Sequence, residues 1–96
     1  MFINTENMLT KANARIKLAS EWVAELTTEI DDSAKRRKAK LAIMMTDDAL
    51  VLVKALRIMV EATPSPVSEE TIIHDRADKI FGDAHYLGAQ AKGYLL

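Results

Sequence analysis

Residues 9–30 read LTKANARIKLASEWVAELTTEI, and small or apolar side chains recur along this stretch at alternating steps of three and four. The recurring positions are Leu9, Ala12, Ile16, Ala19, Val23, Leu26 and Ile30. Such spacing places them in one line along an α-helix, which is how one helix packs along another. With Asn4 as an N-cap residue type, the stretch predicts a long helix over residues 5–30.

A second line of the same spacing follows a short acidic turn. Its positions are Ala42, Met45, Ala49, Leu52, Leu56 and Met59. Because Asp31 and Ser33 are residue types that begin helices and the turn is short, we expect a second helix over residues 33–62, antiparallel to the first. More apolar side chains lie off this line, at Leu50, Val51, Val53, Ile58 and Val60. We expect a third helix or another subunit to cover them.

The last third of the chain begins with a strong helix break at Thr63-Pro64-Ser65-Pro66. A third line of the same spacing then runs through Ile73, Ala77, Ile80, Ala84, Leu87 and Ala91. It predicts either one helix near residues 66–92 or two, with a break or kink favoured at Gly82. The expected fold is therefore all-α: an antiparallel helical bundle, built on a long helical hairpin plus a C-terminal helix or helix pair, in one domain over residues 1–96.

Composition and charge exclude several classes of function. The chain has 96 residues and no Cys, which excludes a disulfide framework, thiolate zinc sites and cysteine nucleophiles and fits a cytoplasmic protein. Its 13 basic residues are balanced by 14 acidic ones, so no overall field favours nucleic acid as the main partner. Charged residues interrupt the most apolar stretch, residues 41–60, and no signal peptide precedes it, so no membrane association is expected.

Five cations fall within six residues at the expected start of the second helix: Lys35, Arg36, Arg37, Lys38 and Lys40. Positive charge at this end opposes the helix dipole. One interpretation is an anion site, in which the free amides of the helix start and these side chains bind a nucleotide-like ligand. The other is a solvated turn whose charge is balanced by the acidic residues just before it.

Carboxylates that could bind a metal ion lie on both predicted helices. Glu21-Trp22-Val23-Ala24-Glu25 and Asp48-Ala49-Leu50 resemble in part the two motifs of the MazG-like all-α nucleotide pyrophosphohydrolases. The resemblance implies magnesium held by Glu21, Glu25 and Asp48 on the phosphates of a nucleotide. Trp22 and Met45 stand where that family has two further glutamates, so the hypothesis is a degenerate enzyme of this kind. No cofactor and no catalytic residue is otherwise expected.

Five large side chains are candidates for an interface: Trp22, Val51, Ile58, Tyr86 and Tyr94. Trp and Tyr are common anchors of protein contacts, although the same residues can also fill a core. Two helices of about 45 Å each are long for so small a chain, so we expect a homo-oligomer, a dimer or higher. The favoured function is a non-enzymatic helical interaction protein, such as a small bacterial or phage regulator or inhibitor, that binds a protein partner. The alternative is an oligomeric binder of a nucleotide-like anion.

Overall fold

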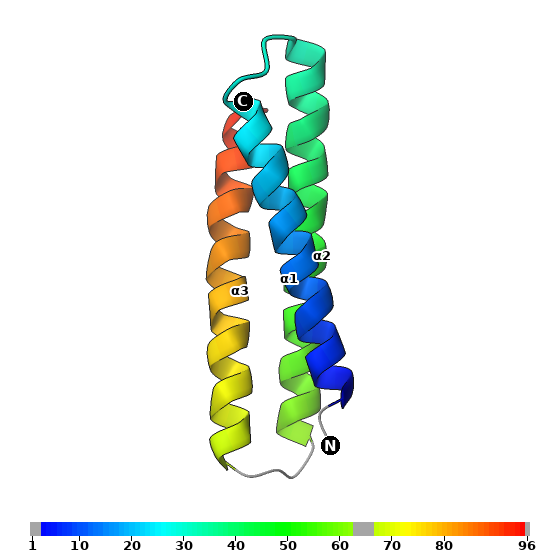
Figure 1. Ribbon diagram of the computed structural model, residues 1–96, viewed down its shortest axis with the longest axis vertical. Helices are drawn as coiled ribbons and strands as arrows, with labels where there is room; N and C mark the ends of the chain where they lie inside the picture. Colours follow the sequence, from blue (N-terminus) through cyan, green and yellow to red (C-terminus); the bar gives the residue numbers. More distant parts are fainter. Residues whose placement is uncertain (1–2, 63–66, 96) are drawn as a thin grey trace.

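Three helices lie side by side along the length of the molecule (Figure 1). The computed structural model describes residues 3–62 and 67–95, and of residues 3, 4, 67 and 68 it describes only the backbone. The helices are α1 (Ile3–Leu26), α2 (Asp32–Ala62) and α3 (Val67–Gly93), and the described ranges contain no strand. They form an elongated bundle of 51 × 19 × 16 Å. The predicted all-α bundle with a long helical hairpin is confirmed.

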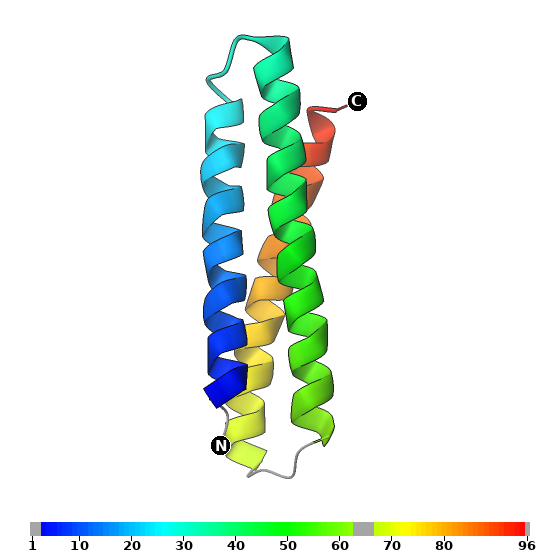
Figure 2. The same cartoon turned by 90° about the vertical axis from the view of Figure 1, so that its right-hand side faces the viewer.

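The direction of the chain alternates from helix to helix. α2 runs antiparallel to both neighbours, so α1 and α3 run parallel to each other (Figure 1). A second view shows α2 crossing in front of α3, with α1 beside it (Figure 2). The N-terminal end of the described chain therefore lies at the opposite end of the bundle from the C-terminal end.

The turn between α1 and α2 begins earlier than predicted. α1 ends at Leu26, because the backbone amides of Thr27 and Thr28 bond the carbonyls three residues back, at 3.3 and 3.2 Å, and close the last turn. The hydroxyl of Thr27 also donates to the Ala24 carbonyl at 2.8 Å. Ile30 consequently falls in the turn, where it is 92% exposed, and the prediction that it continues the packing line is wrong.

The start of α2 agrees with the sequence to within one residue. The Asp31 carboxylate accepts a hydrogen bond from the backbone amide of Ala34 at 3.3 Å, which is the geometry of a helix N-cap. The backbone amide of Lys35 bonds the Asp31 carbonyl at 2.9 Å. Asp31 therefore fixes the point at which the chain reverses.

The core consists of two hydrophobic clusters joined by a layer of small side chains. The lower cluster, toward the end of α2 and the start of α3, contains Leu9, Ala12, Ala49, Val53, Leu56, Val60, Ile73, Ala77 and Ile80. The upper cluster, toward the α1–α2 turn, contains Val23, Leu26, Ala39, Ala42 and Ala91. Between them Ala19, Thr46, Ala84 and Gly88 are buried. Small side chains here let the three helices approach closely.

The packing line of α2 differs from the predicted one at every second position. Thr46, Val53 and Val60 are buried, whereas Met45 and Leu52 are half-buried and Met59 is 37% exposed. The shift occurs because both α1 and α3 pack on α2. The α2 residues that lie between these two helices are the ones that are fully covered. Thr46 tolerates burial because its hydroxyl donates to the Ile43 carbonyl at 2.9 Å.

α3 is one uninterrupted helix, and the break or kink expected at Gly82 is wrong. Ile80 and Ala84 on either side of this glycine are both buried, so packing holds the helix together through it. A Cβ added at Gly82 would meet no atom within 4 Å, whereas one at Gly88 would lie 3.2 Å from Oγ1 of Thr46. Gly88 is thus a close-approach residue, and Gly82 is an exposed helical glycine.

These surroundings predict different results for the same substitution. Gly82→Ala is expected to raise the free energy of unfolding by about 0.5–1 kcal/mol, because alanine loses less backbone entropy in a helix. Gly88→Ala is expected to gain less or to destabilise, since its methyl group crowds Thr46, and to become more favourable in a Thr46→Ala background. Urea unfolding of the variants measures both effects, and equal gains at the two glycines would contradict the proposed close approach.

Candidate functional site

The five cations at the start of α2 do not line one common groove. Lys35 and Arg36 line a groove toward the end of α3, and Arg37 and Lys38 line another toward α1. Lys40, one turn further on, is exposed and belongs to neither lining. The helix spreads adjacent side chains around its axis, so the cations predicted as one site form two pairs and a single residue.

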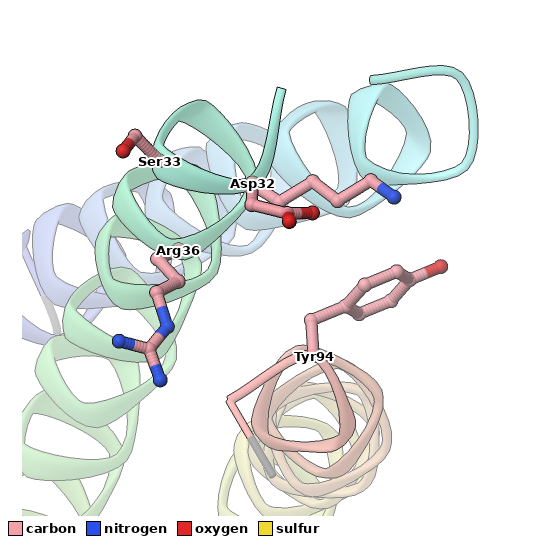
Figure 3. Close-up of a pocket in the computed structure, with 5 residues that line it drawn as sticks. Asp32, Ser33, Arg36 and Tyr94 are labelled. Carbon is pink, nitrogen blue, oxygen red and sulfur yellow. The ribbon is translucent and has the colours of Figure 1, made fainter. Parts of the chain in front are cut away.

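The groove toward α3 combines the first cation pair with an aromatic residue. It has a volume of about 490 Å³ and is lined by Asp32, Ser33, Lys35, Arg36 and Tyr94. Figure 3 shows Asp32, Ser33 and Arg36 on the first turn of α2, and Tyr94 across the groove at the end of α3. Two cations, a hydroxyl and an aromatic ring suit an anion with a flat group, although the Asp32 carboxylate in the same lining offsets part of the charge.

The position of Tyr94 depends on how α3 ends. The backbone amides of Tyr94 and Leu95 bond the carbonyls of Ala91 and Lys92 at 3.1 and 3.0 Å, which tightens the chain after Gly93. Leu95 packs against the upper cluster, while Tyr94 remains 38% exposed. Tyr94, predicted as an interface residue, is therefore placed opposite the basic start of α2.

The second cation pair is partly used inside the molecule. Lys38 Nζ donates to Glu29 Oε2 at 2.6 Å and lies 3.5 Å from Glu25 Oε1. The hydrogen bond from Lys38 lowers the pKa of the Glu29 carboxyl, and the bond to Glu29 raises the pKa of the Lys38 ammonium. Only about a fifth of each of these two side chains is exposed. Lys38 therefore ties α2 to α1 across the turn, as the interpretation of a balanced turn predicts.

The groove toward α1 is smaller and mainly apolar. Its volume is about 260 Å³, and its lining consists of Trp22, Ala34, Arg37, Lys38 and Leu41. Trp22 packs against the upper cluster and is half-buried, so this candidate interface residue also serves the core. Arg37 is exposed at the edge of the groove.

The carboxylates of the resemblance lie in separate surroundings. Glu25 is close to Lys38, and Asp48 lies 3.9 Å from Nε of Arg15 on α1. Glu21 is exposed on the surface of α1. Across residues 3–62 and 67–95, no three His, Cys, Asp or Glu side chains are arranged to hold a metal ion. No observation within these residues therefore supports a magnesium cluster of Glu21, Glu25 and Asp48.

The remaining interface candidates lie on the outside of the bundle. Val51 and Ile58 are 65% and 67% exposed, and Met44, seven residues before Val51, is 55% exposed. We call these three residues the α2 face. Tyr86, at 65% exposure, lies on the outer side of α3, and its hydroxyl accepts a hydrogen bond from Gln90 Nε2 at 3.2 Å. α3 covers Val53 and Val60 but leaves the α2 face open.

Sequence reasoning missed a cluster between α2 and α3. Arg57 pairs with Asp78, and its guanidinium carbon lies 5.4 Å from the centre of the Phe81 ring. The ring of His85 lies 4.4 Å from that of Phe81. These contacts join the two helices beside the lower cluster. The signal in the sequence was the spacing of Asp78 and Phe81, one turn apart on the flank of the packing line of α3.

The pair of Glu29 and Lys38 makes the stability of the turn depend on pH. Since the pKa of Glu29 is lowered on folding, its contribution is present above the ordinary value of 4.5 and is lost as the pH falls through the folded-state pKa. Since the pKa of Lys38 is raised, its contribution is present below 10.5 and is lost as the pH rises further. Glu29→Gln should therefore lower Tm at neutral pH, and the difference from wild type should vanish in acid.

Thermal unfolding from pH 3 to pH 8 measures this dependence. Glu21→Gln is the matched control, because it removes the same charge from an exposed position on α1. A difference in Tm for Glu29→Gln that stays constant across the range would show that the ion pair contributes nothing.

Within the described residues, no helix has an apolar stretch long enough to cross a bilayer. Comparison of the chain with models of protein families, with curated proteins and with solved structures found no match.

Proposed function

We propose that this chain is a non-enzymatic interaction protein that binds a macromolecular partner and forms a homo-oligomer. In this proposal it acts in the cytoplasm as a small regulator or inhibitor. The single observation that carries the proposal is the α2 face, three apolar side chains that are each more than half exposed and seven residues apart. Their line on the outside of α2 gives a partner one continuous edge to contact.

Burial of the α2 face by a partner would contribute to the free energy of association. Full burial of a Val, Ile or Met side chain stabilises by about 1.5–3 kcal/mol relative to exposure. In the isolated chain more than half of each side chain of the α2 face is exposed, so more than half of this stabilisation is absent. A partner helix laid along α2 would recover several kcal/mol, which is enough to offset part of the entropy lost in association.

A second exposed set lies on α3 and points away from the core. Ile72 is 59% exposed and Tyr86 is 65% exposed, fourteen residues apart on the same helix. Tyr86 is a residue type favoured at the centre of interfaces, because it combines a large apolar ring with a hydroxyl. It supports contact with a protein partner at a place separate from the α2 face.

Crosslinking in cells tests this proposal directly. A photoreactive phenylalanine at position 51 or 86 is expected to give adducts of defined mass, while the same residue at Lys17 is the control. Lys17 is exposed on α1, and its apolar neighbour Leu18 is 40% exposed, less than any residue of the α2 face. Adducts at positions 51 and 86 no more abundant than at position 17 would contradict binding through these faces.

A second candidate function is supported by the groove between α2 and α3. In this proposal the oligomer binds a nucleotide-like anion, with Lys35 and Arg36 contacting its phosphates and Tyr94 contacting its flat group. The support is the lining itself, which brings together Lys35 and Arg36 from the start of α2 and Tyr94 from the end of α3. Lys38 plays no direct part, since it is bonded to Glu29.

Arg36 and Arg37 provide a matched pair for the test. The two residues are adjacent and carry the same charge, but Arg36 lines the groove with Tyr94 and Arg37 lines the one with Trp22. Titration calorimetry with ATP and with inorganic pyrophosphate is expected to show about tenfold or greater loss of affinity for Arg36→Glu, because a charge-assisted hydrogen bond contributes roughly 1.5–3 kcal/mol. Arg37→Glu should change affinity far less, and equal losses or no binding by wild type would count against the groove.

A further inference from the structure

We propose that the partner of the α2 face is a second copy of this chain, whose α2 lies antiparallel to the first across a two-fold axis at the level of Leu50 and Val51. This inference rests on the proposed function and names the occupant of one of its surfaces. It is carried by the order of apolar and charged side chains on the outside of α2.

The apolar part of this surface is a narrow line directly opposite the core. Residues seven apart lie almost two full turns apart, so Met44, Val51 and Ile58 form a stripe nearly parallel to the helix axis and about 21 Å long. The core positions Ala42, Ala49 and Leu56 on the other side of α2 are at most 1% exposed. Neither α1 nor α3 covers the stripe, and Figure 2 shows α2 in front of α3.

Charged residues follow one border of this stripe with the same period. They are Lys40, Asp47, Lys54 and Glu61, all exposed, and their signs alternate along the helix. In an antiparallel pair of helices, this border of one copy lies against the same border of the other. An axis at residues 50 and 51 then places Lys40 opposite Glu61 and Asp47 opposite Lys54, in both halves of the dimer. All four contacts join opposite charges.

The apolar positions fit the same arrangement. Val51 meets Val51 of the second copy at the axis, and Met44 meets Ile58 at either end. Asp48, which lies beside the stripe, faces Ala55 rather than another carboxylate, and Arg15 of its own α1 is 3.9 Å away. The register that pairs the charges therefore also pairs the apolar side chains and avoids contact between like charges.

A parallel dimer would not use these charges. In that arrangement the charged border lies against the opposite border of the partner helix. On α2 that border carries Leu41, Asp48 and Ala55. Lysines of the charged border would then face apolar side chains, and Asp47 would face Asp48, a second carboxylate. The sequence of α2 therefore favours the antiparallel pair.

Single cysteines distinguish the two arrangements, because the chain has none of its own. Under mild oxidation Val51→Cys is expected to form a disulfide-linked dimer, since the two copies of residue 51 meet at the axis. Met44→Cys alone should not, because its two copies lie about 21 Å apart along the axis. A mixture of Met44→Cys and Ile58→Cys chains should link efficiently. Linkage of Met44→Cys as efficient as that of Val51→Cys would show a parallel pair and overturn the proposal.

Charge exchange provides a test that leaves the apolar residues unchanged. Asp47→Lys and Lys54→Asp each turn two attractive contacts into repulsive ones, so either variant should weaken the dimer about tenfold in sedimentation equilibrium. The double variant on one chain, or a mixture of the two single variants, should restore it. Lys17→Asp on α1 is the control for a change of net charge.

The outcomes separate this inference from the proposed function. A wild-type dimer whose affinity does not respond to charge exchange at positions 47 and 54 overturns the antiparallel register. A monomeric wild type overturns self-association through the α2 face, and crosslinks from position 51 to a different protein would then assign that face to another partner while leaving the proposed interaction function intact. Loss in the single variants with recovery in the double variant supports the inference.

Discussion

The row of small side chains along the inner face of α2 is the constraint on which the rest of the structure depends. Ala39, Ala42, Thr46 and Ala49 are buried, and they let α1 and α3 approach the same helix from two sides. Side chains this small contribute little apolar area to a core. The first half of α2 therefore has small residues inside, and the helix carries Met44, Val51 and Ile58 outside. A helix with apolar residues on both sides is typical of one that has neighbours on both sides.

Much of the fold could be predicted from periodicity alone. The line from Leu9 to Leu26 is buried or half-buried at every position, because α1 packs with one face only. On α2 the spacing predicts Met45 rather than Thr46 as the core residue. Spacing and hydropathy do not reveal that a second helix covers Thr46, or that its hydroxyl has a backbone partner. The continuity of α3 at Gly82 likewise depends on burial of the flanking residues, which local propensity does not include.

The candidate site was less predictable, because it depends on which helix lies opposite each side chain. Helical geometry already indicates that Arg36 and Arg37 point in different directions. It does not indicate that α3 is just long enough to bring Tyr94 to the start of α2, or that Lys38 bonds Glu29 across the turn. Both facts follow from the lengths of the helices and the position of the turn, which are properties of the whole chain.

The odd number of helices has a mechanical consequence. Because α1 and α3 run parallel, the two ends of the described chain lie at opposite ends of a bundle 51 Å long. Tension applied between these ends acts along the helix axes and loads the helix contacts in shear. The contacts must then slide together rather than open one after another from an end. The bundle can thus bear a pulling load along its length that an antiparallel two-helix hairpin, held by neighbouring ends, would release by unzipping.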